Sequence, residues 1–260
     1  MEIYINTDKN KDIAIKAKED LMKISNKLNL KITSNVEDAD IIFSIGGDGT
    51  FLESSKLTKK GKVIGVNCGT LGYLTDINVE DLEKAVTYIL DGKYYIEERM
   101  MLEGEILKEN GEVIKIPEAL NEIAISKNTF GVVRFDAIID GKFINSYTAD
   151  GILVCTPTGS TAYNLSCGGP IVDPTAKILT LTPIAPHTVI NRSIVLSDES
   201  EVEIKITELR DNTSSYVLYD GKPIKVETGD VVRINKSERT TSIIKLNWQS
   251  FIDTIRDNIN

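Results

Sequence analysis

The stretch that decides the fold is Ile41-Ile42-Phe43-Ser44-Ile45-Gly46-Gly47-Asp48-Gly49-Thr50. An unbroken apolar run ends in a cluster of glycines that holds a single carboxylate. This pattern predicts a buried strand that leads into a phosphate-binding turn, because glycines let the backbone approach an anion and successive N–H groups form a concave anion site. Gly46, Gly47, Gly49 and Thr50 are therefore candidate phosphate-binding residues.

The carboxylate of Asp48 indicates catalysis as well as binding. A carboxylate beside phosphates repels them unless it holds a metal ion or accepts a proton from an attacking hydroxyl. The turn therefore favours phosphoryl transfer, with Asp48 as the catalytic residue. The alternative interpretation is a tight turn in which Asp48 caps the following helix and the glycines serve only the backbone geometry.

Strand and helix patterns alternate through the first 90 residues. Strands are predicted at residues 2–6, 30–33, 40–45 and 63–67, and helices at residues 13–28 with Asp8 as the cap, 50–60 and 81–90. This alternation predicts a mostly parallel sheet wrapped by helices, in which ligands bind beyond the carboxyl ends of the strands. The turn at residues 46–50 and a second glycine loop at residues 67–73, which includes Tyr73, both lie at such ends.

Short alternating strands replace this pattern from about residue 94. Hairpin signals occur at Asn110-Gly111, Asp140-Gly141 and Asp220-Gly221. Strands are predicted at residues 132–139, 152–156, 193–197, 201–206, 216–219 and 230–234, which together indicate an all-β sandwich. Residues 248–259 return to helical spacing, and we expect this helix to pack back on the first domain. The predicted domains are therefore residues 1–95 plus 246–260, and residues 96–245.

The composition is that of an ordinary globular protein with a net charge of -9 over 260 residues. This charge argues against nucleic acid and anionic membranes as partners, but it permits a small phosphorylated ligand. Three cysteines without a CxxC pattern predict reduced thiols in a cytoplasmic protein, and the single histidine excludes a His-rich zinc site. The N-terminus lacks the pattern of a signal peptide, and no apolar run has membrane-spanning length.

Two further stretches carry candidate ligand-binding side chains. Hydroxyls gather after an apolar strand in Asp150-Gly151-Ile152-Leu153-Val154-Cys155-Thr156-Pro157-Thr158-Gly159-Ser160-Thr161-Ala162-Tyr163-Asn164-Leu165-Ser166. Such side chains suit ribose hydroxyls and base edges, whereas the alternative is a loop that saturates its own backbone. Asn121 and Glu122 interrupt an apolar run, and a buried amide or carboxylate is costly without a partner. This pair either grips a ligand's hydroxyls or forms the polar face of an edge strand.

Taken together, three motifs resemble the NAD kinases. They are the turn at residues 46–50, the Asn121-Glu122 pair and the stretch Thr156-Pro157-Thr158-Gly159-Ser160-Thr161-Ala162-Tyr163-Asn164-Leu165-Ser166, in that order through most of the chain. The first motif is shared with lipid kinases and more loosely with phosphofructokinases, whereas the third is specific. The resemblance implies a Rossmann-like α/β domain, a C-terminal β-sandwich and a site between them. It also implies ATP-dependent phosphorylation of the 2′-hydroxyl on the adenosine ribose of NAD.

The resemblance also implies a role for each motif residue. Asp48 would accept the proton, while the glycines of the turn would cradle the donor phosphates. The residues implied for NAD are Asn121 and Glu122 at the adenosine ribose, Asp150 at the nicotinamide half, and Thr161, Ala162, Tyr163 and Ser166 around the adenine and ribose with Ala185 nearby. The wider binding set adds Thr50, Tyr73, Thr148, Asn164 and Leu165. Family members form dimers or tetramers in which a neighbouring subunit contributes substrate contacts.

Charge compensation is the point at which this chain departs from its relatives. Thr148 and Glu53 stand where many relatives have basic residues. Because no lysine occurs in the glycine turn, we expect a divalent cation, Mg²⁺, to neutralise much of the phosphate charge. The alternatives to an NAD kinase are a lipid or small-alcohol kinase with the same turn, and a dinucleotide-binding regulator without turnover. The choice between ATP and polyphosphate as donor stays open.

Overall fold

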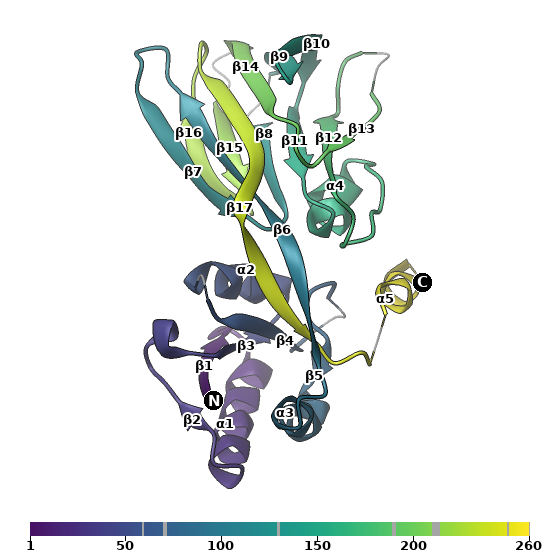
Figure 1. Ribbon diagram of the computed structural model, residues 1–260. Coiled ribbons are helices and arrows are strands. Elements are labelled where there is room, and N and C mark those ends of the chain that lie inside the picture. Colours follow the sequence, from purple (N-terminus) through teal and green to yellow (C-terminus); the bar gives the residue numbers. More distant parts are fainter. Residues whose placement is uncertain are drawn as a thin grey trace. The chain divides into compact units, whose positions relative to one another are not determined.

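The computed structural model describes residues 1–58, 60–69, 72–128, 131–188, 191–209, 214–248 and 250–259. The chain divides into two compact units, which we call the α/β unit (Met1–Arg99 with Thr241–Asn260) and the β unit (Met100–Thr240). Two long strands, β6 (Tyr95–Leu107) and β17 (Val231–Lys245), contribute residues to both units and pair with each other (Figure 1).

The α/β unit contains a parallel sheet. Its strands are β1 (Glu2–Thr7), β2 (Lys31–Ile32), β3 (Ile41–Gly46), β4 (Lys62–Asn67) and β5 (Ile77–Asn78). They run in the order β2-β1-β3-β4, with β5 and the end of β17 also paired to β4, and every one of these pairings is parallel. The predicted mostly parallel sheet is therefore confirmed.

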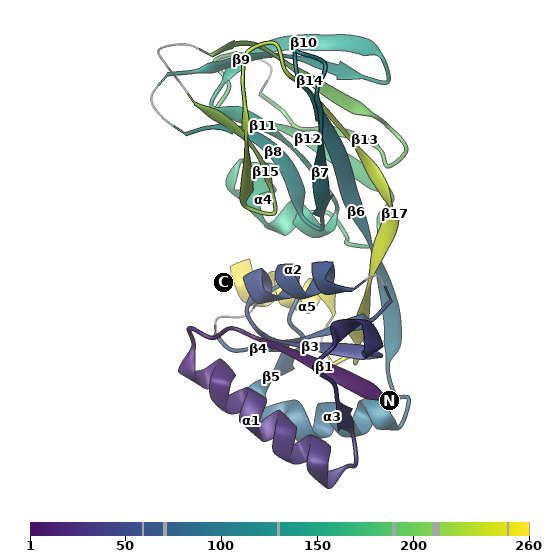
Figure 2. The same cartoon turned by 90° about the vertical axis from the view of Figure 1, so that its left-hand side faces the viewer.

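Helices cover both faces of this sheet. Helices α1 (Asp12–Lys27) and α3 (Leu82–Leu90) lie on one face and α2 (Asp48–Leu57) on the other (Figure 2). The core combines Ala14, Ala17 and Leu21 of α1 with apolar residues of α3 and of the strands. Asp8 was expected to cap α1, but Lys11 is the residue at its N-terminal cap. The Asp8 carboxylate instead accepts the N–H of Asn10 at 3.0 Å, which closes a local turn. Short 3₁₀ turns, Val36–Asp38 and Val79–Asp81, complete the unit.

The C-terminal segment is tied to the α/β unit through Trp248. Its ring meets Tyr88 of α3 edge-on, with ring centroids 5.4 Å apart, and the Lys84 ammonium lies 4.4 Å from its ring centroid. The last helix, α5, begins at Phe251 and ends at Ile259, and Gln249 lies outside the described residues. Ile252 remains 69% exposed, so the apolar face predicted for this helix is only partly covered. Among the helices that the structure describes, none is long and apolar enough to cross a bilayer.

The β unit is built from two largely antiparallel sheets around one core. One sheet contains β9 (Val133–Ile139), β10 (Lys142–Ala149) and β14 (Val202–Leu209) with β17, β6 and β7 (Val113–Ala119). The other runs β13-β12-β11-β8-β15-β16, where the strands are β8 (Glu122–Lys127), β11 (Gly151–Cys155), β12 (Ile178–Ile184), β13 (Ile194–Ser197), β15 (Ser215–Tyr219) and β16 (Lys222–Val226). Buried residues of both sheets, such as Phe135 and Ile152, share this core, which confirms the predicted sandwich.

All three predicted hairpins form. Asn110-Gly111 joins β6 to β7, and Asp140-Gly141 joins β9 to β10. Asp220-Gly221 joins β15 to β16 with φ angles of 45° and 79°. Positive φ at both central positions is the conformation of a type I′ turn, which Asp-Gly sequences favour.

Gly65 on β4 is expected to be essential for stability. A Cβ at this position would lie 2.7 Å from the Leu74 carbonyl oxygen and 2.8 Å from Thr75 Cα. We expect Gly65→Ala to lower the free energy of unfolding by about 1–3 kcal/mol, because backbone atoms must move to admit the methyl group. Denaturant titration measures this change. Gly49→Ala is the control, since a Cβ there would meet nothing within 4 Å. Equal stability of the two variants would contradict the packing argument.

Candidate active site

Three strand ends meet at one edge of the parallel sheet. Thr7 at the end of β1 lies opposite Ile45 of β3, and Gly46 lies opposite Asn67 at the end of β4. Hydrogen bonds continue past these ends, from Asp8 N–H to the Ile45 carbonyl at 2.9 Å and from Cys68 N–H to the Gly46 carbonyl at 2.8 Å. The loops that follow β1, β3 and β4 therefore emerge side by side. Thr70 and Leu71 of the third loop lie outside the described residues.

The glycine turn leads directly into α2. A Cβ on Gly46 would lie 2.2 Å from Thr50 Oγ1, so only glycine lets the strand end pack against the first turn of the helix. Gly47 occupies the N-terminal cap of α2, and Asp48 is its first residue. Within the described residues no side chain caps this helix, so the alternative interpretation of Asp48 as a helix cap is wrong.

The Asp48 carboxylate is held by the loop after β4. One oxygen accepts the N–H of Tyr73 at 3.0 Å and the other accepts the N–H of Leu74 at 3.1 Å. A Cβ on Gly72 would lie 2.3 Å from Asp48 Oδ1, so glycine at this position lets the loop close on the carboxylate. These bonds join the two glycine loops and orient a half-buried carboxylate before any ligand binds.

A pocket of about 590 Å³ opens beside the glycine turn. Its walls come from the loop after β1 and from the first turns of α2: Asn6, Thr7, Asp8, Lys9, Asn10, Lys11, Gly47, Gly49, Thr50 and Glu53. The sequence patterns did not indicate Lys9 and Lys11, because both lie outside the glycine turn. The position of Lys11 just after the first predicted strand was the signal that could have identified it.

In the β unit, Asn121 and Glu122 lie at the start of β8 and are each 8% exposed. Strand β8 lies between β11 and β15, so the alternative interpretation of an edge-strand face is wrong. The Asp220 carboxylate accepts the N–H groups of Leu120 at 3.0 Å and Asn121 at 2.8 Å. Asp220 therefore positions the pair from the neighbouring hairpin, a role that its Asp-Gly sequence did not reveal.

The hydroxyl-rich stretch packs directly on the Asn121–Glu122 pair. Thr156 donates its N–H to the Asn121 carbonyl at 2.9 Å and its hydroxyl to the Leu120 carbonyl at 2.6 Å. A Cβ on Gly159 would lie 2.1 Å from the Asn121 carbonyl oxygen, so only glycine permits this approach. The 3₁₀ turn Thr158–Thr161 and the short helix α4 (Tyr163–Ser166) follow. Two motifs that are distant in the sequence thus form one cluster.

Asn164 has a structural place in this cluster. Its side chain is fully buried, donates to the carbonyls of Ser160 at 3.2 Å and Pro170 at 3.0 Å, and accepts the Thr182 hydroxyl at 2.7 Å. The Thr161 hydroxyl likewise donates to a carbonyl of its own turn at 3.4 Å. Part of the hydroxyl-rich stretch therefore uses its side chains to bond its own backbone. This was one of the two interpretations of its sequence. Leu165 and Ser166 are exposed, whereas Thr161, Ala162 and Tyr163 are half-buried.

Burial and the Glu122 carboxylate raise the pKa values of two side chains near α4, Cys155 and Tyr163. Glu122 lies opposite Cys155 in the pairing of β8 with β11. Burial, reinforced by this carboxylate, raises the pKa of the Cys155 thiol to about 12. Burial also raises the pKa of Tyr163, against a hydrogen bond to Ser126 that lowers it. The phenol therefore stays protonated near neutral pH and can donate a hydrogen bond to a ligand.

Asp150 and Ala185 lie where β11 and β12 meet. Asp150 donates its N–H to the Ile184 carbonyl at 3.0 Å, and its carboxylate lies 2.6 Å from the Lys127 ammonium. Ala185 follows with a φ of 44°. Thr148 belongs to the other sheet, where it lies opposite Arg134, so a basic residue stands beside position 148 on the neighbouring strand.

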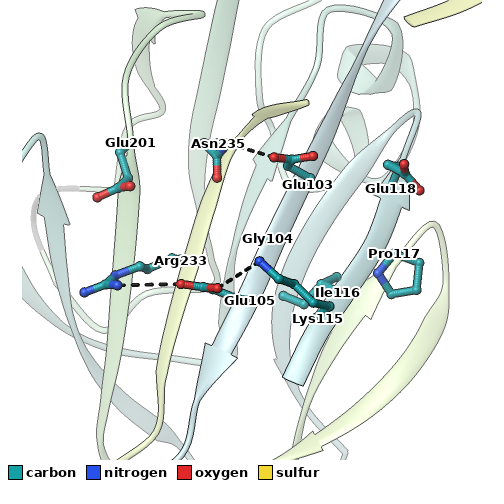
Figure 3. Close-up of a pocket in the computed structure, with 10 residues that line it drawn as sticks. All are labelled: Glu103, Gly104, Glu105, Lys115, Ile116, Pro117, Glu118, Glu201, Arg233 and Asn235. Carbon is teal, nitrogen blue, oxygen red and sulfur yellow. Dashed lines mark hydrogen bonds and ion pairs between the residues drawn. The ribbon is translucent and has the colours of Figure 1, made fainter. Parts of the chain in front are cut away.

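A second pocket, of about 460 Å³, lies in the β unit and is lined by none of the predicted site residues (Figure 3). Some of its charged groups are paired with one another. Glu105 lies 3.1 Å from Lys115 and 3.6 Å from Arg233, and Glu103 accepts a hydrogen bond from Asn235 at 3.4 Å.

Comparisons with known proteins identify relatives across the whole chain. The family descriptions that match are the ATP-NAD kinase N-terminal domain over residues 3–94 and the ATP-NAD kinase C-terminal domain over residues 120–246. An NAD kinase of Caldanaerobacter subterraneus subsp. tengcongensis is 40% identical over 225 residues, which cover 85% of this chain and 78% of the relative. An NAD kinase of Thermoanaerobacter sp. strain X514 is 36% identical over 233 residues, which cover 88% and 81%.

Two solved structures share the fold. The yeast NADH kinase complexed with NADH has a TM-score of 0.86 at 23% identity, covering 100% of this chain and 86% of that one. The NAD kinase from Archaeoglobus fulgidus in complex with ATP has a TM-score of 0.80 at 25% identity, covering 98% of each chain.

Replacing Asp220 tests its positioning role. We expect Asp220→Asn to accelerate hydrogen exchange at the Leu120 and Asn121 amides and to lower the free energy of unfolding by about 1–3 kcal/mol, because one carboxylate oxygen is replaced by an amide donor. Exchange measured by NMR or mass spectrometry reports both effects. Asp140→Asn is the matched control: Asp140 also precedes glycine in a hairpin and accepts a backbone N–H, that of Glu201 at 2.9 Å. If only the control accelerated exchange at residues 120–122, the proposed role would be wrong.

Proposed function

Because the chain belongs to the NAD kinase family, it is a phosphotransferase that phosphorylates NAD, and we propose that Asp48 is its proton acceptor. The phosphoryl donor is ATP, and the acceptor is the 2′-hydroxyl of the adenosine ribose, so the product is NADP. The observation that carries this proposal is a carboxylate held in place beside a glycine turn. Neither alternative, a lipid kinase or a regulator, has comparable support, since both halves of the chain match NAD kinase families.

Asp48 deprotonates the attacking hydroxyl. The ribose O2′ forms a bond to the terminal phosphorus of ATP, the bond from that phosphorus to the departing ADP oxygen breaks, and the hydroxyl proton passes to Asp48. A ribose hydroxyl is a weak acid, so a carboxylate within hydrogen-bond reach assists the step. The N–H groups of Tyr73 and Leu74 fix the carboxylate, which reduces the reorganisation needed at the moment of transfer.

The β unit binds NAD. Asn121 and Glu122, fixed by Asp220, hold the hydroxyls of the adenosine ribose. Tyr163 stacks on the adenosine and donates its phenolic hydrogen, while Thr161, Ala162 and Ser166 line the same pocket. Asp150 contacts the nicotinamide half with Thr148 and Ala185 nearby. Asn164 supports this pocket through its buried hydrogen bonds.

A divalent cation, Mg²⁺, arrives with the ATP phosphates. Within the described part of the chain, no three acidic, cysteine or histidine side chains come together as a metal site. Mg²⁺ suits this arrangement, because it retains several waters and is bound through substrate phosphates with one or two carboxylates. When bound, the ion would neutralise charge on the transferred phosphoryl group. We propose further that the enzyme acts in the cytoplasm as a homodimer or homotetramer.

Removing the charge of Asp48 tests the proton acceptor. We expect Asp48→Asn to lower the turnover number for NADP formation by roughly 10²- to 10⁴-fold, with little change in the dissociation constant for NAD. A coupled assay with an NADP-specific dehydrogenase measures turnover, and calorimetry measures NAD binding. Asp12→Asn is the matched control, because Asp12 is the first residue of α1 as Asp48 is of α2. An Asp48→Asn enzyme with more than a tenth of the normal turnover would exclude this role.

Neutralising Glu122 tests the ribose contact. We expect Glu122→Gln to raise the KM for NAD by about tenfold, the equivalent of ~1.4 kcal/mol, because a neutral amide accepts hydrogen bonds from ribose hydroxyls more weakly than a carboxylate. The KM for ATP should stay unchanged in the same steady-state titrations. Glu112→Gln, at an exposed position of the same unit, serves as the control. An unchanged KM for NAD would contradict the ribose contact, and a rise in both KM values would show that the effect is not confined to NAD.

A further inference from the structure

Lys11 reaches the glycine turn from a loop that belongs to another strand. Its ammonium nitrogen lies 3.8 Å from the point where a Cβ on Gly47 would stand, and 3.5 Å from the corresponding point on Gly69. It therefore lies against both glycine loops, one after β3 and the other after β4. These are ordinary van der Waals distances, so the ammonium lies directly against the backbone of both glycines.

The Lys11 ammonium is not paired with a carboxylate in the part of the chain that the structure describes, unlike Lys108 and Lys245, each 2.7 Å from an aspartate oxygen. Asp8 and Glu53 also line its pocket, but the Asp8 carboxylate is engaged by the Asn10 N–H. The Lys11 charge also influences Cys68, whose pKa it lowers against the larger raising effect of burial. A cation without a partner at a pocket wall attracts an anion.

The same pocket adjoins the N-terminal ends of two helices. Lys11 is the cap residue of α1 and Gly47 is the cap residue of α2, which are 16 and 10 residues long. No side-chain hydrogen bond caps either of these helices, as far as the described residues show. The N–H groups of both first turns add partial positive charge at this point. These N–H groups and the Lys11 ammonium therefore lie at the same pocket.

We propose that Lys11 is the residue that binds the phosphate chain of the donor, and that it thereby determines the affinity for ATP. The inference rests on the proposed function for the identity of the donor, but the binding of a polyphosphate anion can be tested without it. Lys11 supplies the positive charge that the glycine turn itself lacks. A lysine binds phosphate as a mobile point charge, so it follows the oxygens of the chain without a fixed geometry. Lys11 takes no part in the proton transfer to Asp48.

The kinetic test compares Lys11→Met with wild type. We expect the KM for ATP to rise about tenfold or more while the KM for NAD changes less than twofold, because the lost charge faces the phosphate chain alone. Lys11→Arg, which retains the charge, should restore most of the ATP affinity. Lys16→Met is the matched control, since Lys16 is an exposed lysine of α1 outside the pocket. An unchanged KM for ATP in Lys11→Met would overturn the proposal.

Calorimetry with inorganic tripolyphosphate separates this inference from the proposed reaction. Wild type and Lys16→Met should bind tripolyphosphate equally, whereas Lys11→Met should bind it about tenfold more weakly. If the protein formed no NADP but this difference held, the reaction would be wrong and the phosphate site would stand. If the protein formed NADP and the three proteins bound tripolyphosphate alike, Lys11 would have no role in donor binding. Thermal unfolding of each variant shows whether its fold is intact.

Discussion

The pair of hydrogen bonds from Tyr73 and Leu74 to the Asp48 carboxylate is the constraint on which the α/β unit depends. It requires the loop after β4 to lie against the first turn of α2, and that closeness leaves no room for a side chain at Gly72, while Thr50 leaves none at Gly46. Packing within the unit therefore requires these glycines, whether or not an anion binds at the turn. A glycine turn can thus be required by the carboxylate that it surrounds.

The β unit also uses a carboxylate that accepts backbone N–H groups to hold functional residues in place. Asp220 in a hairpin turn accepts backbone N–H groups from the segment that carries Asn121, and Thr156 binds that segment from the other side. In both units a carboxylate from one connection fixes the backbone of another. The functional side chains are then placed by backbone bonds, which hold a position more rigidly than side-chain packing alone.

Local patterns predicted much of this architecture, but interactions between distant segments did not follow from them. Apolar runs, helical spacing and Asp-Gly pairs indicated the parallel sheet and the hairpins, because each depends on neighbouring residues. Strand β10 was one of several strands that the predicted list lacks, since it follows its turn with the exposed Phe143 and Ile144 and only later alternates. The burial of Asn164 among carbonyl groups, and the approach of Lys11 to Gly47, depend on register and loop closure. The order of residues therefore gave no sign of the first and only a weak one of the second, the position of Lys11 just after a predicted strand.

The shared strands β6 and β17 have a consequence for biosynthesis. Ile243, Ile244 and Leu246 are buried in the α/β unit, yet they follow the whole β unit in the chain. On the ribosome, the sheet edge at β4 therefore lacks its last strand while residues 100–240 are translated, which takes roughly seven to thirty seconds at about 5–20 residues per second. During that interval Val63 of β4 lacks its partner from β17, and an unpaired strand edge can pair with another chain. The β unit can complete its own core first, so the half of the chain that is synthesised first is the last to finish folding.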